Sequence, residues 1–395
     1  MNKADSSSKP LVGLVVADFT RILAGPMCTM VLADLGADVI KIERPVIGDD
    51  TRTWGPPFVD DDAAYFLSIN RNKRSIELDL TADDDAKVAR DIIERSDVLV
   101  ENFRPGVMDK FGFAYTDVSV LNPGLVYCSM PAYLSGDQRN LPGYDLLMQA
   151  ASGFMSITGE TGREPVKMGV ALLDVISGLY GAVAILSALR DRDKGGQGRL
   201  VEVGLFEASV ASLVNQAANY LMGSEVPVAT GNSHPNIVPY QGFSASNGRF
   251  VLAAANDKLF RAAATAMNRS ELADDARFAS NGKRVAHRAE LIEEMEEIFM
   301  SQPVDYWVDA FVRAGVPAAP VRTIDQVFAS PEGLSTLMNV ADSNHGPLRL
   351  VRSPIRYGEQ VDGEAKPPPT LGRHQAEVLE WITKSEPLRT GQRGG

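Results

Sequence analysis

The sequence predicts an α/β fold: a large Rossmann-like part built on a parallel sheet with helices on both faces, and a smaller α+β domain. Two observations predict it. Short apolar runs alternate with helix-like segments over the first 205 residues, as expected for a parallel sheet covered on both sides. From about Gly223 the chain becomes rich in Gly, Pro and Asn, which is typical of a long ordered loop or linker. A length of 395 residues suffices for two domains.

The apolar runs of the first part fit buried strands. They are Leu14–Asp18, Asp38–Glu43, Ser75–Asp79, Val98–Glu101 and Leu125–Ser129, and we expect them to complete the strand set. Pro26 opens a helix over Met27–Leu35, which Gly36 ends. Thr81 is the expected cap of a second helix that runs to about Arg95.

The second part of the chain predicts a loop, a hairpin and several helices. Two strands fall within Gly242–Ala255, and helices are expected near 257–267, 286–300, 304–313 and 374–384. The end of the chain, SEPLRTGQRGG, is expected to be disordered. We therefore place a first α/β part at 1–222 and the loop and small α+β domain at 223–325, with 326–395 following them.

Charge and composition exclude several classes of function. The net charge is −12 and no basic face is evident, which argues against a nucleic-acid partner. The uncharged run 175–189 is shorter than a membrane span, so no membrane partner is expected. Cys28 and Cys128 lie in apolar surroundings and are expected to be buried and reduced. With no secretory or transit signal near the N-terminus, we expect a cytoplasmic protein.

Asp174 is the only charged residue between Lys167 and Arg190, in the stretch MGVALLDVISGLYGAVAILSAL. A carboxylate is costly to bury and rarely lies in such a run without a role. One interpretation is an N-cap for a helix over 175–189. The other is a nucleophile, and the two are compatible because the helix dipole keeps a carboxylate ionised.

Other catalytic centres have little support in the sequence. There is no GxSxG motif. The four histidines form no HxxH pair, which argues against a metal site. His287 and His374 are expected to be solvated, and His234 is expected to fix a turn in its loop; the fourth is His345.

Polar residues follow the predicted strands, at the edge where ligands bind in open α/β sheets. The first loop, FTRILAGP, lacks a GxGxxG dinucleotide motif. The group comprises Arg21, Arg44, Asn102, Arg104 and Lys110. Because guanidinium groups bind phosphate in a bidentate manner, the cluster indicates a phosphate-rich ligand. Trp54 could form a wall of that site, but a core position is favoured.

Several segments, taken in this order, resemble the class III CoA-transferases of the CaiB/BaiF type, a family related to the α-methylacyl-CoA racemases. They are DFTRILAGP, LADLGADVIKIERP, NRNKRSIELDL, DVLVENFRPGVMDKFGF, LPGYDLLMQAASGFMSITG and VALLDVISGLYGAVAILSAL. The resemblance covers about residues 11–222 and, more weakly, the PYQ loop and the LGRHQAEVL segment.

The resemblance implies an interlocked homodimer whose large Rossmann-like domain is formed by both chain ends. It implies that Asp174 is the nucleophile and that coenzyme A is a substrate, with no tightly bound cofactor. The residues implied to contact acyl-CoA are Leu23, Ala24, Arg44, Leu78, Thr81, Asn102, Phe103, Arg104, Lys110 and Tyr144.

The sequence departs from two branches of the family. Formyl-CoA transferases carry Gln at Leu23, Lys at Thr81 and Pro142, and a glycine-rich loop where this chain has ATGNSHPNIVPYQ. Racemases carry His at Tyr144, and a phenol is a poor general base near pH 7. We therefore expect transfer of CoA from an acyl-CoA, with succinyl-CoA favoured, to a carboxylic acid, a dicarboxylate being favoured. The expected intermediates are an aspartyl anhydride and an aspartyl-CoA thioester. A racemase and a catalytically silent acyl-CoA-binding protein are the alternatives.

Overall fold

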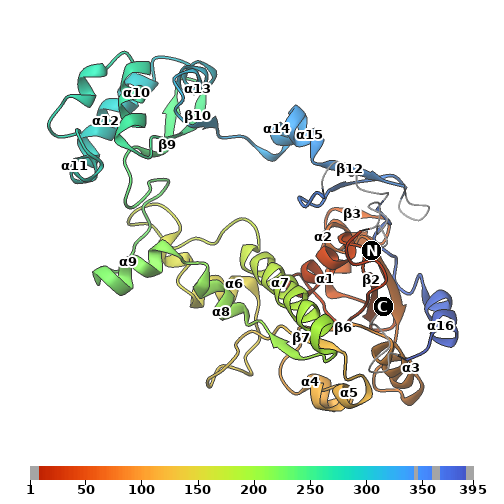
Figure 1. Cartoon of the computed structure of the whole chain (residues 1–395). Coiled ribbons are helices and arrows are strands. Elements are labelled where there is room, and N and C mark those ends of the chain that lie inside the picture. Colours follow the sequence, from red (N-terminus) through yellow and green to blue (C-terminus); the bar gives the residue numbers. More distant parts are fainter. Residues whose placement is uncertain (1–8, 342–345, 358–364, 388–395) are drawn as a thin grey trace. The chain divides into compact units, whose positions relative to one another are not determined.

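The computed structural model describes residues 9–341, 346–357 and 365–387, and its chain forms two compact units (Figure 1). The larger unit comprises Met1–Phe154, Lys167–Ser224 and Thr336–Gly395. The smaller unit comprises Met155–Val166 and Glu225–Ser335. The observed divisions lie near 224 and 335, whereas the sequence predicts boundaries at 222 and 325. Residues 155–166, expected in the larger domain, belong to the smaller unit.

The larger unit is built on a six-stranded parallel sheet in the order β5-β2-β1-β6-β7-β8. Its strands are β1 (Val15–Asp18), β2 (Asp38–Glu43), β5 (Lys73–Glu77), β6 (Val98–Glu101), β7 (Val126–Ser129) and β8 (Leu200–Glu202). This confirms the predicted α/β class with a parallel central sheet. The expectation that five strands complete the set was wrong. The sixth, β8, has three residues, of which none is buried, so it leaves no apolar run in the sequence.

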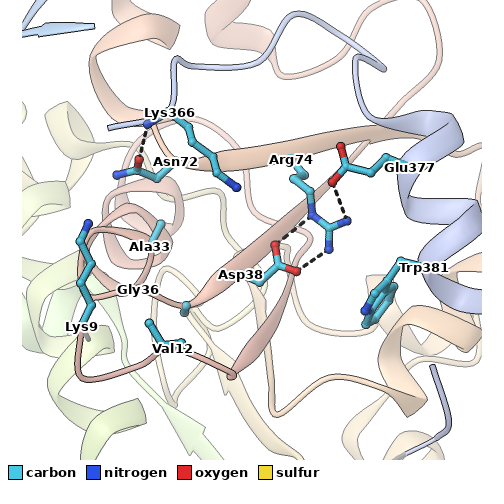
Figure 2. Close-up of a pocket in the computed structure, with 11 residues that line it drawn as sticks. Lys9, Val12, Ala33, Gly36, Asp38, Asn72, Arg74, Lys366, Glu377 and Trp381 are labelled. Carbon is cyan, nitrogen blue, oxygen red and sulfur yellow. Dashed lines mark hydrogen bonds and ion pairs between the residues drawn. The ribbon is translucent and has the colours of Figure 1, made fainter. Parts of the chain in front are cut away.

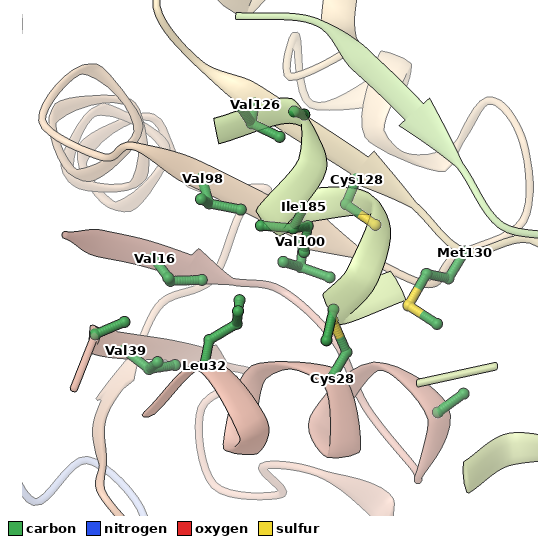
Figure 3. Packing of buried hydrophobic residues seen from close by; sticks show 14 of the residues in the cluster. Val16, Cys28, Leu32, Val39, Val98, Val100, Val126, Cys128, Met130 and Ile185 are labelled. Carbon is green, nitrogen blue, oxygen red and sulfur yellow. The ribbon is translucent and has the colours of Figure 1, made fainter. Parts of the chain in front are cut away.

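The two faces of the sheet carry separate cores because successive side chains of a strand point to opposite faces. Val16, Val39, Val98 and Val126 pack on one face against helices α1 (Ala24–Asp34) and α7 (Leu172–Gly195), as Figure 3 shows for their side chains with Leu32 and Ile185. The neighbouring residues in these strands point to the other face. The helices that cover it are α3 (Asp83–Glu94), α5 (Tyr115–Leu121) and α16 (Gln375–Lys384).

Helix α7 is long and apolar enough, by length and composition alone, to cross a membrane, and half of its most apolar window is buried in the protein. Gly178 and Gly181 allow its close approach to α1. A Cβ atom at Gly178 would lie 2.6 Å from the carbonyl oxygen of Ala24, and one at Gly181 would lie 3.1 Å from Cys28 Sγ. The helix therefore serves as a core element of the larger unit, while Val183 and its neighbours on another face are exposed.

The C-terminal segment binds along the outer edge of β5. Asn72 exchanges two hydrogen bonds with Lys366. Ser75 N–H donates to His374 Nδ1 at 3.2 Å, and the His374 N–H donates to the Ser75 carbonyl oxygen at 2.9 Å. The expectation that His374 is solvated was wrong, because its half-buried ring accepts a backbone hydrogen bond at a strand edge. The end of the expected disordered tail, 388–395, lies outside the described residues.

Shorter elements complete the larger unit. The hairpin of β12 (Leu337–Val340) and β13 (Leu348–Val351) packs its buried residues Val340 and Leu348 against Phe66 and Leu67 of α2 (Ala64–Ile69). The other elements are β3 (Phe58–Val59), β4 (Asp62–Ala63), α4 (Val107–Lys110), α6 (Asp145–Ala151), α8 (Leu205–Ala211) and α9 (Asn215–Gly223).

The smaller unit combines an antiparallel sheet with helices. Its strands pair in the order β11-β10-β9, with bounds β9 (Tyr240–Ala245), β10 (Gly248–Ala253) and β11 (Ala318–Pro320). Phe243, Phe250, Phe299 and Phe311 form its aromatic core with Trp307, whose Nε1 donates to the Phe299 carbonyl oxygen at 2.9 Å. Its helices are α10 (Asp257–Ala266), α11 (Asn281–Ala286), α12 (Arg288–Phe299), α13 (Val304–Arg313), α14 (Ile324–Ala329) and α15 (Pro331–Ser335). The helix expected near 286–300 is α12, which begins at Arg288, and the preceding α11 ends at Ala286.

Candidate active site

Two hollows lie at opposite ends of the strands of the parallel sheet, one at their amino ends and one at their carboxyl ends. The larger, with a volume of about 490 Å³, lies at the amino ends of β2 and β5 (Figure 2). Its arginine, Arg74, is already neutralised: Nε and Nη2 bind both oxygens of Asp38 at 2.9 and 2.5 Å, and Nη1 lies 3.4 Å from Glu377. This hollow presents no nucleophile of the kind the sequence indicates.

The second hollow lies beyond the carboxyl ends of β1, β6 and β7, where ligands bind in open α/β sheets. Asp174 forms part of its wall, together with polar residues that follow these strands. The complete lining is Arg21, Ile22, Leu23, Ala24, Asp50, Asn102, Phe103, Arg104, Met130, Ala132, Leu141, Pro142, Gly143, Tyr144, Asp174 and Leu205. Its volume is about 110 Å³, smaller than that of the first hollow. The chemistry of its lining residues, rather than its size, makes it the candidate active site.

Asp174 lies in the first turn of α7 and is not its N-cap. The N-cap position is Ala171, so the capping interpretation was wrong. Asp145, the first residue of α6, caps the helix instead: its Oδ1 accepts the backbone N–H groups of Leu173 at 2.9 Å and of Asp174 at 3.3 Å. The Asp174 side chain is therefore free of a capping role and forms part of the hollow.

The Asp174 carboxyl group is buried without a counterion. The residue is 6% exposed, and within the described part of the chain no cation or hydrogen-bond donor pairs with its oxygens. Burial, followed by the negative charge of Asp145, raises the pKa of Asp174 to about 7. Near neutral pH this carboxyl group is thus poorly solvated and only partly ionised.

The loop after β1 approaches Asp174 in an unusual backbone conformation. Ile22 has a φ of 71°, which is rare for a β-branched residue and costs on the order of 1–3 kcal/mol. Its N-terminal side is anchored: the Asn102 side chain exchanges hydrogen bonds of 2.7 and 3.0 Å with the Arg21 backbone, and Ile22 N–H donates to Asp49 Oδ1 at 3.2 Å. The loop is therefore held in shape before any ligand binds.

Buried ion pairs lie beneath this loop. Lys41 Nζ binds Asp49 Oδ2 at 2.9 Å and the Thr20 carbonyl oxygen at 2.8 Å. Lys73 Nζ binds Asp18 Oδ2 at 3.1 Å. All four charged side chains are fully buried, so the pairs join β1, β2 and β5 to the floor of the site.

The cationic rim of the hollow is partly organised by Asp50. Arg44 Nη2 lies 2.7 Å from Asp50 Oδ1, and Arg21 Nη1 lies 3.4 Å from Asp50 Oδ2. Arg104 is exposed and has no ion-pair partner among the described residues. Two guanidinium groups are thus oriented by one carboxylate, and a third is available to an anionic ligand.

The structure brings most, but not all, of the expected contact residues into the hollow. Six line it with Asp174: Leu23, Ala24, Asn102, Phe103, Arg104 and Tyr144. Arg44 is next to it through Asp50. Three are not among its lining residues: Leu78 is buried, while Thr81 and Lys110 are exposed. Thr81 does not cap α3 as expected, because the N-cap is Ala82 and the Thr81 hydroxyl binds Asp79.

Sequence reasoning missed three residues near Asp174: Asp145, Asp50 and Tyr65. Tyr65 on α2 is half-buried, and burial followed by the charge of Asp174 raises its pKa to about 12. Its ring is edge-to-face with that of Trp54, 5.6 Å between centroids. The favoured core position of Trp54 was wrong, because 42% of it is exposed. An acid at the start of an apolar helical run could have indicated Asp145; no local signal indicates Tyr65.

None of the described histidines is among the residues that line this hollow. His234 Nδ1 accepts the Asn236 N–H at 3.1 Å, as expected of a residue that fixes a turn, and His287 pairs with Glu290 at 2.9 Å. His345 lies outside the described residues. No group of three or more His, Cys, Asp or Glu within the described residues could hold a metal ion. Cys28 and Cys128 are free and buried.

Comparison with known proteins places the chain among CoA-transferases. Residues 11–375 match CoA-transferase family III. Succinyl-CoA:glutarate CoA-transferase of Homo sapiens is 38% identical over 97% of this chain and 88% of the human protein. Succinate–glutarate CoA-transferase of Agrobacterium fabrum is 38% identical over 99% of this chain and its own full length. The crystal structure of a CaiB/BaiF family protein from Brucella suis superposes with a TM-score of 0.84, at 41% identity, over 95% of this chain and all of that one.

Proposed function

Because this chain belongs to CoA-transferase family III, we propose that it moves CoA from succinyl-CoA to a dicarboxylic acid such as glutarate through the side chain of Asp174. The enzyme class follows from the family and from relatives that are themselves CoA-transferases. The observation that carries the role of Asp174 is its position: a buried carboxyl group without a counterion lines the same hollow as Arg21, Asn102 and Arg104. The donor and acceptor are those named for the human relative.

The proposed reaction consists of exchanges at carbonyl carbon. A carboxylate oxygen of Asp174 attacks the thioester carbonyl, the C–S bond breaks, and a mixed anhydride and CoA thiolate form. The thiolate then attacks the Asp174 carbonyl carbon of the anhydride, which releases succinate and leaves a thioester between Asp174 and CoA. The acceptor carboxylate attacks this thioester, and the same steps run in reverse. Each step consumes one anion and produces one, so no redox or metal chemistry is needed.

The surroundings of Asp174 suit this chemistry in two ways. A poorly solvated carboxylate is a stronger nucleophile than a hydrated one, and a dry site protects an anhydride from hydrolysis. The apolar residues Leu23, Met130 and Leu205 on the wall of the hollow contribute to that dryness. Arg104 and the Arg21–Asp50–Arg44 group are then the proposed ligands for the phosphates of CoA, with Lys110 as an outer contact.

The proposed assembly is a homodimer, interlocked as the family resemblance implies. Its support is apolar surface that a monomer would expose. Leu221 and Met222 on α9 are 77% and 87% exposed, and Leu179, Tyr180 and Val183 are exposed on α7. Light scattering should give twice the mass of one chain, and replacement of Leu221 and Met222 by Lys should lower the mass or solubility. A monodisperse wild-type monomer would contradict this proposal.

A variant series at Asp174 tests the proposed nucleophile. Asp174→Ala and Asp174→Asn should lower succinyl-CoA:glutarate transfer by at least about 10³-fold, as loss of a nucleophile does in other enzymes. Binding of CoA should persist. The matched control is Asp193→Ala, which removes an exposed acid from the last turns of the same helix and should leave transfer unchanged.

Two outcomes would overturn parts of the proposal. Full transfer by Asp174→Ala would remove the covalent mechanism. Exchange of the α-proton of a 2-methylacyl-CoA with solvent deuterium, without transfer to any acid of a dicarboxylate panel, would favour a racemase instead.

A further inference from the structure

The residue that holds Asp174 in place is itself a buried carboxylate, Asp145. Its Oδ1 accepts both the Leu173 and the Asp174 backbone N–H, at 2.9 and 3.3 Å. Its Oδ2 accepts Gln149 Nε2 at 2.5 Å. All of these donors are neutral, and among the described residues no cation pairs with the Asp145 carboxylate.

Gln149 extends the same connection to the segment before α7. Gln149 is almost completely buried, and its Oε1 accepts the Met168 N–H at 2.8 Å. Asp145 and Gln149 are four residues apart on α6, so one face of that short helix holds both the approach to α7 and its first turn. This arrangement fixes the backbone of Asp174 and leaves its side chain free to line the hollow.

A carboxylate is an unusual choice for this position beside a nucleophile that is itself an acid. A Ser, Thr or Asn oxygen would accept the same N–H groups. The negative charge of Asp145 disfavours ionised Asp174 and has no such effect on a neutral form of that side chain. Acylation or thioester formation removes the charge of Asp174 as protonation does, so the covalent states escape this repulsion.

We propose that Asp145 is a positioning residue that also favours the covalent states of Asp174, by holding the first turn of α7 with a charged acceptor. The inference rests on the proposed function of Asp174. The repulsion makes the free carboxylate less stable and hence more nucleophilic, and it stabilises the aspartyl-CoA thioester relative to free enzyme.

Other charged groups near Asp174 do not provide this effect. From α2, Tyr65 faces Asp174, and its pKa is raised to about 12, so it stays neutral in the working range. At the rim, Arg21 is engaged by Asp50, and Arg104 is exposed. On α6 the charged neighbour of Asp174 is Asp145. Its negative charge, after burial, raises the pKa of Asp174.

The test is Asp145→Asn, which keeps an oxygen acceptor of the same shape and removes the charge. In wild-type enzyme, the acid limb of the pH profile of kcat/KM for succinyl-CoA should lie near pH 7. In Asp145→Asn it should move to lower pH by at least about half a unit. The equilibrium ratio of CoA adduct to free enzyme, measured by intact mass with succinyl-CoA, should fall by the matching factor of about threefold.

The matched control is Asp50→Asn, which removes a negative charge from the same hollow without contacting α7. It should change the KM for succinyl-CoA and leave the acid limb where it is. If Asp145→Asn does not fold, Asp145→Ser supplies a shorter neutral oxygen for the same measurements.

An acid limb that is identical in wild type and Asp145→Asn, with equal adduct fractions, would overturn the inference and leave the nucleophilic role of Asp174 intact. A wild-type acid limb below pH 5 would overturn it without any variant. Failure of the proposed function is distinguishable, because transfer would then either be retained by Asp174→Ala or be absent from the wild type.

Discussion

Two groups of buried carboxylates in the larger unit differ in how their charge is compensated. Asp18 and Asp49, beneath the loop after β1, are each bound by a buried lysine. Burial alone would raise their pKa values, but the lysines and neighbouring hydroxyl groups outweigh it, so the pKa of each is lowered. Asp174 is buried to a similar degree without a cation, and its pKa is raised. For these three buried carboxylates, the presence or absence of a counterion therefore decides whether the pKa is lowered or raised.

The largest effect on stability is expected where the compensated pair is broken. Asp18→Ala leaves Lys73 and Lys41 buried close together with one counter-charge fewer, and removal of one member of a buried pair costs about 3–5 kcal/mol of unfolding free energy. Urea unfolding followed by tryptophan fluorescence in a Trp307→Phe background reports on the larger unit, because Trp54 and Trp381 both belong to it. A loss below about 1 kcal/mol would mean that this pair is not structural.

Asp174→Asn should instead raise the free energy of unfolding. Its raised folded-state pKa means that wild-type protein loses stability as the pH rises from about 4, the unfolded value, through about 7, where the buried group ionises. The Asn variant escapes this loss, so its advantage over wild type should grow across that window and be constant above it. Unfolding at pH 5 and pH 8 measures the difference. A variant that is less stable than wild type at pH 8 would show that the Asp174 charge is compensated in the folded protein.

The smallest of these effects concerns His374 at the edge of β5. Burial lowers the pKa of His374, and only the unprotonated Nδ1 accepts the Ser75 N–H. This hydrogen bond contributes about 0.5–1.5 kcal/mol to the free energy of unfolding. The contribution is therefore present above the pKa of His374 in the unfolded chain, near 6.5, and is lost as the pH falls through its lower pKa in the folded protein. His374→Ala should remove this pH dependence. Protection of the Ser75 amide against hydrogen exchange at pH 7.5, compared with Asn72 as an internal reference, measures it; equal protection in both proteins would contradict the assignment.

Much of the fold could be predicted because its signals are local. The strands Asp38–Glu43 and Val98–Glu101 were predicted with their observed bounds, since the Val, Ile and Leu residues of each form a short cluster flanked by charged residues. β8 and the strand-edge contact of His374 were not, because three exposed-to-half-buried residues and a single histidine carry no local pattern.

In the candidate site, too, only the features with a local signal could be predicted. Asp174 is conspicuous as a lone charge in an apolar stretch, but the start of its helix was misplaced. The cap comes from Asp145, 29 residues away in sequence, and capping rules that examine neighbouring residues cannot find it. The strained backbone at Ile22, and Tyr65 beside Asp174, likewise depend on contacts between distant segments.

The proposed mechanism requires that Asp174 carries the transferred group covalently. The most direct measurement incubates the enzyme with succinyl-CoA, traps the adduct with hydroxylamine or borohydride, and maps the modified residue by peptide mass spectrometry. We expect modification at Asp174, absent from Asp174→Ala and present in Asp193→Ala. Modification at another residue, or transfer to glutarate at full rate with Asp174 unmodified throughout turnover, would contradict it.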